Sequence, residues 1–497
     1  MTTATDVTAV PIGRRVRDLA ATRPDAPAVT CGDDTVTWAD LDRRTNRMAR
    51  ALADAGVDQG RFVTIALPNG VGFVLVCVAV WKLGAVPQPV SWRLPEAELA
   101  GVVDLADPPV VVGPVAVPGR RAVLPEELEA GGHGDGPLPD RVSPSWKAPT
   151  SGGSTGRPKL IVSGTPGVVE DRATRFWRCG ADDTLLMPGP MFHNGPFASA
   201  FAGFLEGGHL VLLPRFDAAA TLREVERHRA TWLYLVPTMM NRIWRLPEER
   251  RAAHDLSSLR TVWHLAAPCP PWLKHAWIDW LGPERIWELY GGTESIATTV
   301  IAGTEWLDRP GSVGRPAYGE IAVLGPDGRR LPPGEVGEVY MRRDEGVPAT
   351  YRYIGAEARS LGEWESLGDL GSLDADGFLY LADRRTDMIL VGGENVYPAE
   401  VEAALEEHPD VLSCAVVGLP DDDLGQAVHA IVQARDGRAG DALRDELDRW
   451  AGERLERMKR PRSVEFVDVP LRDDAGKVRR SALRAERIGT PRREAAG

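Results

Sequence analysis

Lysine is scarce in this sequence. Only six of the 58 basic residues are lysines, namely Lys82, Lys147, Lys159, Lys274, Lys459 and Lys477. Arginine is therefore the default cation of the chain. An ammonium is a compact point charge, whereas a guanidinium is a wide planar fork, and a tight phosphate or carboxylate site can require the former. A lysine inside a functional motif therefore indicates a binding site more strongly here than in a chain of ordinary composition.

Cysteine is also scarce. The five cysteines are scattered along the chain, with no CxxC pair and no clustered histidines, at Cys31, Cys77, Cys179, Cys269 and Cys414. A disulfide framework or a structural zinc site needs a recognisable spacing of cysteines, so neither is indicated. We expect all five thiols to be reduced and buried.

Long apolar runs are missing as well. The most apolar run, residues 71–81, is too short to span a bilayer, and the N-terminus has no basic segment followed by an apolar core. We therefore expect a cytoplasmic protein that does not bind membranes. The formal net charge of −13 argues against nucleic acid as a partner.

The sequence is long, and its helical and strand patterns alternate regularly. A chain of 497 residues exceeds one ordinary core, so more than one domain is expected. Helical and strand patterns alternate, as in a helix over 37–52 that begins with the capping pair Thr37 and Asp40, and strands over 61–67 and 85–90. This alternation predicts a large α/β domain of sheets covered by helices.

Two other stretches depart from this alternation. The Pro- and Gly-rich segment 117–139 is expected to form surface loops. After about residue 384 the elements become short, and an amphipathic helix with Leu443, Leu447, Trp450, Leu455 and Met458 on one face is expected. A small α+β C-terminal domain is the predicted result.

A loop rich in glycine and hydroxyl groups lies at residues 149–162, PTSGGSTGRPKLIV. A flexible linker is one interpretation, but the apolar residues after Lys159 predict a buried strand that fixes one end of the loop. The loop is not a Walker A motif, because Arg157 and Pro158 separate the second glycine from the lysine. Backbone N–H groups, hydroxyls and one ammonium favour phosphate binding by Thr150, Ser151, Gly152, Gly153, Ser154, Thr155, Gly156 and Lys159.

Three further motifs follow in order: WELYGGTES (287–295), LGDLGSLDADGFLYLADRRTDMILVGGENVYPAEVE (367–402) and PLRDDAGKVRR (470–480). Together with the loop, they resemble the adenylate-forming superfamily of acyl-CoA synthetases, nonribosomal-peptide adenylation domains and beetle luciferases. The resemblance covers nearly the whole chain. GGSTGRPKLI and MFHNGPF most resemble bile-acid and polycyclic-acid CoA ligases.

The resemblance implies an ATP-dependent acid–CoA ligase. Such enzymes join a carboxylate to the α-phosphate of ATP, release pyrophosphate, and then transfer the acyl group from AMP to a thiol. The loop would hold the β- and γ-phosphates, Glu294 would help to hold Mg²⁺, and Thr293 would donate to the α-phosphate. Outside this motif, Glu294 would be interpreted as an exposed acid at a helix start.

The same resemblance implies an adenosine site. Tyr290 would stack on adenine, Glu288 would accept from its exocyclic amine, and Asp369 would bind the ribose hydroxyls together with Arg384. The remaining nucleotide-binding positions are the wall formed by Ala266, Ala267 and Pro268 and the motif residues Leu289, Gly291 and Gly292.

The C-terminal motif implies a moving lysine. Lys477 would bridge the carboxylate and the phosphate during adenylation, and a surface lysine is the alternative. The small domain would then rotate, and Gly392 and Gly393 would line the channel for the pantetheine arm, although a plain β-turn also explains this pair. The expected division is a large domain (1–383), a hinge (384–387) and a small mobile domain (388–497).

The chain departs from the family pattern at several positions. Thr386 stands where the hinge residue is usually Asp or Lys, so which residue swivels is left open. Leu160 and the pair Leu265–Ala266 stand where glycine is usual, and Leu367 where threonine is usual. None of these changes removes a charged catalytic group.

His193 indicates the class of substrate. Amino-acid adenylation domains carry an Asp at the corresponding position, which pairs with the substrate ammonium, and His193 leaves no such counter-charge. We therefore expect a bulky apolar, polycyclic or terpenoid carboxylic acid, with His193 shaping or gating the acyl pocket; a packed histidine is the alternative.

Two alternatives to a CoA ligase stay open. They are a free-standing ligase that loads a carrier-protein phosphopantetheine, and a silent nucleotide-binding protein on the same fold. The oligomeric state is also open, with a homodimer as one option.

Overall fold

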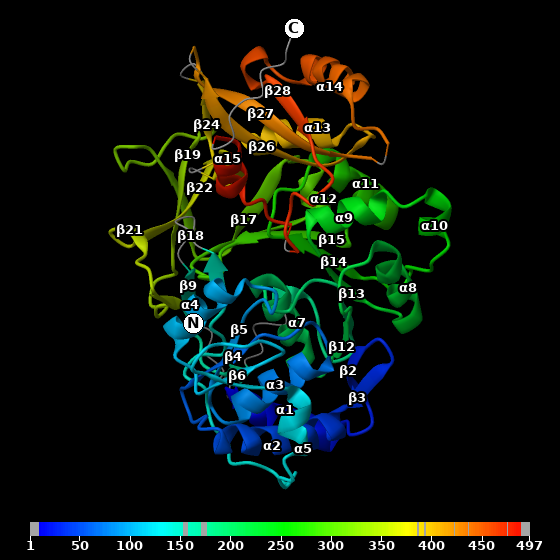
Figure 1. The fold of residues 1–497 in the computed structure, drawn as a ribbon, viewed down its shortest axis with the longest axis vertical. Coiled ribbons are helices and arrows are strands. Elements are labelled where there is room, and N and C mark those ends of the chain that lie inside the picture. Colours follow the sequence, from blue (N-terminus) through cyan, green and yellow to red (C-terminus); the bar gives the residue numbers. More distant parts are fainter. Residues whose placement is uncertain are drawn as a thin grey trace.

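The computed structural model describes residues 9–152, 158–169, 176–384, 387–391, 394–421, 423–435, 437–474 and 476–488. The side chains of Ser151, Gly152 and Arg384 lie outside this description. The small C-terminal domain, coloured orange to red in Figure 1, lies at one end of a larger body that begins with the N-terminal helices.

A 14-stranded sheet runs through the large domain. Its parallel part has the order β15-β14-β13-β11-β12-β2, formed by Ile286–Gly291, Thr261–Leu265, Trp232–Leu235, Thr184–Met187, His209–Leu212 and Pro27–Cys31. The antiparallel part adds β16 (Thr298–Ala302), β17 (Ser312–Tyr318), β23 (Leu379–Arg384), β22 (Trp364–Leu373), β19 (Gly337–Arg342) and β18 (Glu320–Leu324). β3 (Asp34–Thr37) and β21 (Arg359–Leu361) extend the sheet at β2 and β22.

Smaller sheets complete the large domain. A four-stranded parallel sheet has the order β5-β4-β6-β7, formed by Val86–Pro89, Phe62–Ile65, Val110–Val112 and Arg121–Val123. β8 (Thr150–Gly152), β9 (Pro158–Ser163) and β20 (Tyr351–Ile354) form a three-stranded sheet, and β1 (Val10–Pro11) pairs with β10 (Val168–Val169). Leu160 is fully buried in β9 and Ile161 and Val162 nearly so, which confirms the strand predicted after the glycine-rich loop.

The helices of the large domain cover these sheets. They are α1 (Ile12–Thr22), α2 (Trp38–Asp54), α3 (Val71–Lys82), α4 (Glu96–Ala106), α5 (Pro125–Ala130), α7 (Asn194–Glu206), α8 (Ala218–His228), α9 (Pro237–Trp244), α10 (Glu248–Ala252), α11 (Pro271–Leu281) and α12 (Gly303–Trp306). The predicted cap of α2 is confirmed, since the Thr37 hydroxyl accepts a hydrogen bond from the Asp40 backbone N–H at 3.3 Å.

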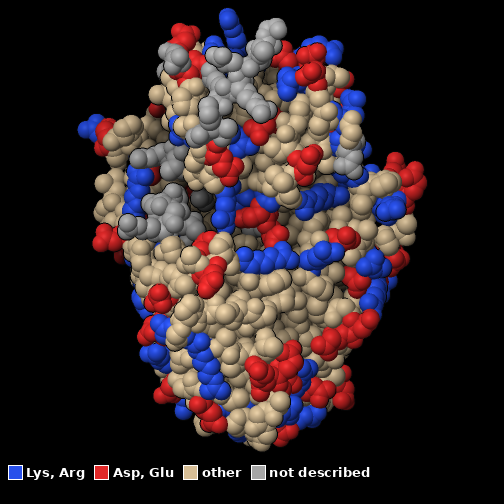
Figure 2. All heavy atoms as spheres, viewed as in Figure 1, with Lys and Arg blue, Asp and Glu red and all other residues tan. Residues whose placement is uncertain are grey.

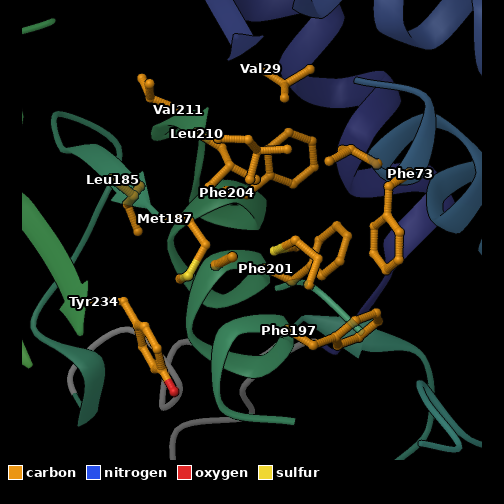
Figure 3. Close-up of a cluster of buried hydrophobic side chains, with 14 of the residues drawn as sticks. Val29, Phe73, Leu185, Met187, Phe197, Phe201, Phe204, Leu210, Val211 and Tyr234 are labelled. Atoms are coloured by element: carbon orange, nitrogen blue, oxygen red, sulfur yellow. The ribbon is translucent and has the colours of Figure 1, made fainter. Parts of the chain in front are cut away.

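Aromatic side chains from α7 fill the centre of the core. Phe197, Phe201 and Phe204 lie on one side of this helix, toward Phe73 of α3, and Tyr234 lies on its other side (Figure 3). The Phe201 ring is 4.8 Å from the Trp81 ring in an edge-to-face arrangement, which adds to the free energy of apolar burial. These contacts hold α7 in the core, and they thereby fix the position of the residues at its start.

The small domain has its own core, as predicted. It contains β24 (Ile389–Val391), β25 (Glu394–Val396), α13 (Pro398–Glu406), β26 (Val411–Asp421), β27 (Gly425–Ala434), α14 (Asp441–Arg454), the 3₁₀ turn Arg457–Lys459, β28 (Ser463–Phe466) and α15 (Arg480–Ile488). Leu455 and Met458 were expected on the amphipathic helix, but α14 ends at Arg454 and the chain turns to bring both against the same core.

Three other expectations need comment. The segment 117–139 is not only loop, because Val123 and Leu128 are buried in β7 and α5. All five cysteines are unpaired, but Cys31 and Cys269 are half-buried rather than buried. No helix in the described ranges combines the length and the apolar character that crossing a membrane would require.

Candidate active site

A cavity of about 2500 Å³ lies between the two domains, and its walls come from both. Figure 2 shows basic and acidic side chains gathered around a hollow where the small domain meets the body. Fifteen of the predicted site residues line this cavity: Thr150, Lys159, His193, Ala266, Ala267, Pro268, Glu288, Leu289, Tyr290, Gly291, Gly292, Thr293, Glu294, Asp369 and Lys477. They come from segments up to 327 residues apart, from Thr150 to Lys477, and folding brings them together.

A carboxylate and a lysine from different motifs meet at the glycine-rich loop. Glu294 is only 6% exposed and accepts a hydrogen bond from the Tyr353 hydroxyl at 2.6 Å. Lys159 Nζ lies 3.7 Å from the same carboxylate oxygen and 3.9 Å from the centre of the Tyr353 ring. Burial and the Glu294 charge raise the pKa of Tyr353 far above its usual range, so its hydroxyl stays a donor. Tyr353, on β20, had no signal in the sequence.

A second pair lies at the predicted adenosine site. The Tyr290 hydroxyl, at the end of β15, donates to Asp369 on β22 at 2.7 Å. Gly292 follows β15, and a Cβ there would stand 2.3 Å from Leu367 Cδ1 and 2.6 Å from Glu294 Oε2, so a larger residue would displace both side chains. Ala266 has a φ of 76°, in the left-handed region that glycine prefers, at a position where the family usually has glycine.

Glu288, on the cavity wall, forms an ion pair with Lys274. Its carboxylate lies 2.5 Å from Lys274 Nζ of α11, and both side chains are buried. Burial raises the pKa of Glu288, and the ammonium of Lys274 opposes this shift. The predicted bond from Glu288 to the adenine amine would therefore have to form beside an existing ion pair.

Lys477 projects from a tight hairpin of the small domain. Arg472 and Val478 form an isolated β-bridge, and the Lys477 backbone N–H donates to Asp473 Oδ1 at 2.9 Å. The base of the hairpin is fixed because the Arg472 guanidinium bonds Glu406 on α13 at 3.0 Å. At its tip, a Cβ on Gly476 would stand 2.9 Å from Thr238 Oγ1, so the hairpin touches α9 of the large domain.

His193 lies opposite this hairpin, at the residue before α7. Burial lowers its pKa to about 4, and Asp473, Lys477 and Asp474 of the hairpin act on it electrostatically. His193 is therefore neutral at pH 7.

Lys147 is a cavity residue that the sequence motifs did not single out. It precedes the glycine-rich loop, is 4% exposed, and donates a hydrogen bond to Asn194 Oδ1 at the start of α7. Its Nζ lies 4.4 Å from the centre of the Trp146 ring. Burial lowers its pKa to about 7, and the charge of Glu294 partly opposes this. The only signal in the sequence was the scarcity of lysine.

Some predicted positions cannot be placed. Gly153, Ser154, Thr155, Gly156, Thr386, Gly392 and Gly393 lie outside the described residues, as do the side chains of Ser151, Gly152 and Arg384. The domain boundaries stay predictions; β23 ends at Arg384 and β24 begins at Ile389.

The donor set of the cavity suits Mg²⁺ that is carried by a triphosphate. Across the described ranges, no group of three or more His, Cys, Asp or Glu side chains is arranged as a metal site. Mg²⁺ commonly binds through one or two protein carboxylates together with phosphate oxygens and water, and Glu294 provides one such carboxylate beside Lys159 of the glycine-rich loop. This residue therefore fits the predicted role.

Comparison with known proteins defines the family. Residues 16–352 match the model of the AMP-binding enzyme family, and residues 400–477 match the C-terminal domain of AMP-binding enzymes. The chain belongs to this family.

Individual relatives agree over nearly the whole length. A feruloyl-CoA synthase of Amycolatopsis sp is 34% identical over 483 residues, which covers 93% of this chain and 96% of the relative. The fatty acid–[acyl-carrier-protein] ligase ScoC of Streptomyces coeruleorubidus is 32% identical over 491 residues, with 93% of both chains covered. The solved structure of o-succinylbenzoate CoA synthetase (MenE) from Bacillus subtilis, in complex with its acyl-adenylate intermediate, has a TM-score of 0.80 at 26% identity, covering 96% of this chain and 98% of that one.

The predicted class of enzyme is confirmed. The chain is an AMP-forming acid–CoA ligase of the adenylate-forming type, with ATP, Mg²⁺ and CoA as its cofactors and a small-molecule acid as its substrate.

Proposed function

We propose that this enzyme activates a bulky, largely apolar carboxylic acid as its acyl-adenylate and passes the acyl group to CoA. The observation that carries the proposal is the single cavity lined by Lys477 of the small domain and by Glu294, Tyr290 and Asp369 of the large domain. A lysine hairpin and a phosphate loop facing one cavity suit a reaction between a carboxylate and a triphosphate.

In the first step, a carboxylate oxygen attacks the α-phosphorus, and the bond to the bridging oxygen breaks as pyrophosphate leaves. Lys159 would neutralise charge on the leaving phosphates, and Lys477 would hold the attacking carboxylate against the α-phosphate. Glu294 would hold Mg²⁺, which supplies positive charge to the triphosphate. In the second step, the thiol sulfur attacks the carbonyl carbon and AMP leaves.

The acyl part would lie along α7. Phe201 and Leu205 of this helix and Trp177 are among the apolar residues that line the cavity, so an acid with a hydrocarbon body would bury apolar surface there. The named substrates of two relatives, ferulate and o-succinylbenzoate, are aromatic acids and support an aryl acid as one form of this substrate.

A carrier protein is the second candidate acceptor. ScoC is named for loading an acyl carrier protein, and its phosphopantetheine thiol is the same chemical group that CoA presents.

The test is ATP–pyrophosphate exchange with a panel of steroid-like, diterpenoid and aryl acids, followed by thioester formation with free CoA and with a carrier protein. Exchange with at least one apolar acid and a thioester with CoA are expected. Nucleotide binding without exchange for any acid would show a silent nucleotide-binding protein instead.

Arg245 holds the two domains in the observed arrangement. This residue follows α9 and donates to the carbonyls of Pro409 at 2.8 Å and Glu406 at 3.1 Å, at the end of α13. These bonds must break if the small domain rotates between the two steps. We expect Arg245→Met to slow adenylation up to about a hundredfold, because it removes two charged hydrogen bonds worth roughly 1.5 kcal/mol each. Thioester formation from pre-made acyl-AMP should be unchanged or faster.

Single-turnover measurements of the two half-reactions test this prediction. Arg242→Met is the matched control, since Arg242 is exposed on α9, three residues before Arg245. Equal slowing of both half-reactions by Arg245→Met would contradict a role in domain arrangement.

A further inference from the structure

Two polar side chains, Lys147 and Tyr234, lie against the first residues of α7 on the cavity wall. Lys147 donates to Asn194 Oδ1, and a Cβ on Gly195 would stand 2.7 Å from the Tyr234 hydroxyl. Lys147 and Tyr234 therefore flank the same two residues, Asn194 and Gly195, and all four line the cavity.

Among the described residues, no carboxylate lies directly beside the ammonium of Lys147. In the described part of the chain, no carboxylate lies within 4 Å of its Nζ, whereas the buried Lys82 and Lys274 lie 2.6 Å and 2.5 Å from Asp42 and Glu288. A buried charge without a partner is costly, so it is normally paired or hydrogen-bonded. A bound anion would supply the negative charge that the ammonium of Lys147 lacks.

The Tyr234 hydroxyl is a second donor for which the described part of the chain supplies no acceptor. The residue is 1% exposed, and among the described residues burial alone, with no hydrogen bond, acts on the hydroxyl. Burial raises the pKa of Tyr234 well above its usual range, so the oxygen keeps its proton. A lysine and a tyrosine with free donating capacity therefore lie next to consecutive residues on the wall of one cavity.

We propose that Lys147, Asn194 and Tyr234 form a binding site for a second oxygen-bearing group of the acid substrate, in the first place a second carboxylate. This inference rests on the proposed function and refines it: the acyl body is largely apolar but carries a polar oxygen group apart from the reacting carboxylate. Lys147 and Tyr234 donate to that group, and Asn194 orients the ammonium.

Lys147 and Lys477 come to the start of α7 from different domains. The Lys477 hairpin approaches His193, which interacts electrostatically with Asp473, Lys477 and Asp474. Lys147 interacts electrostatically with Glu294 and lies in the large domain, before the phosphate loop. Two cations on different elements suit two separate anionic groups of one substrate.

The test compares matched acids. Fatty acids from octanoate to hexadecanoate are paired with α,ω-dicarboxylic acids of the same chain length, and phenylpropanoate is paired with its ring-carboxylated isomers. The wild-type enzyme is expected to prefer at least one dicarboxylic acid in kcat/KM for ATP–pyrophosphate exchange. Lys147→Met is expected to reduce that preference by about 30-fold, mainly through KM, because it removes a charged hydrogen bond.

Two nearly isosteric variants keep the test independent of folding. Asn194→Asp would pair with Lys147 inside the protein and should abolish most of the preference, while Tyr234→Phe should reduce it by about fivefold. In all three variants the plain monocarboxylic acids should keep kcat/KM within about threefold of wild type.

The pH dependence adds a readout that a purely structural role would not produce. The pKa of Lys147 lies at about 7 in the free enzyme. Its neighbours Trp146 and Asn194 are neutral, Tyr234 stays protonated, and Glu294 is the charged group that acts on it. The preference for the dicarboxylic acid should therefore fall between pH 6 and pH 9 as the ammonium loses its proton, and it should not vary with pH in Lys147→Met.

Other outcomes would overturn the inference. An equal loss for both members of each pair would place Lys147 at the reacting carboxylate or in the stability of the fold, and a raised KM for ATP at an unchanged preference would place it at phosphate. A wild-type enzyme that prefers every plain acid would also refute the site. Failure of the proposed function is distinct, because then no acid of the panel would support exchange.

Discussion

Replacing Lys477 by alanine is expected to slow adenylation by ~10²-fold, which corresponds to about 3 kcal/mol of lost transition-state stabilisation. The hairpin that carries Lys477 touches Thr238 of the large domain and places the lysine on the wall of the cavity that Glu294 and Asp369 also line. The ammonium would meet the carboxylate and the α-phosphate only while negative charge gathers between them, so its loss should reduce kcat more than it raises KM.

The two half-reactions distinguish this role from a general one. Thioester formation from pre-made acyl-AMP should be largely spared, because the thiol approaches the carbonyl after the lysine has left. Lys459→Ala is the matched control, since Lys459 lies in the same domain and its bond to Glu400, at 2.8 Å, is a surface ion pair worth at most about 1 kcal/mol. An equal loss in both half-reactions for Lys477→Ala would refute the assignment.

Amino acids are expected to be rejected by at least about 10³-fold relative to an apolar acid, because an α-ammonium buried without a counter-charge costs several kcal/mol. His193 stands at the position where amino-acid adenylation domains carry a carboxylate, and its pKa of about 4 keeps it neutral at pH 7. Lys147 brings a second cation to the same cavity and would repel the ammonium.

Exchange assays with the proteinogenic amino acids, run beside steroid-like, diterpenoid and aryl acids, measure this ratio. Each amino acid should be compared with the acid that lacks its amino group, so that only the ammonium differs. Robust exchange with any α-amino acid, together with no exchange for any of the apolar acids, would overturn both the role of His193 and the proposed class of substrate.

Local features of the chain could be predicted from the sequence. The cap of α2 needs only Thr37 and Asp40, three residues apart, and the buried strand β9 needs only its own apolar run. The order of the motifs was enough to identify the family and to name Glu294, Asp369 and Lys477, because each motif keeps its residues at fixed short spacings. These features depend on neighbours within a few residues, so they can be found without knowledge of the fold.

The tertiary structure alone decided which charges are buried and paired. Glu288 looked available to a ligand, but the packing of α11 against β15 places Lys274 on its carboxylate. The sequence does not show that Lys147 bonds the start of α7. It also does not show that Arg245 bonds the segment after α13. Burial and electrostatic interaction depend on distances between segments that are far apart in the chain, and those distances exist only in the folded molecule.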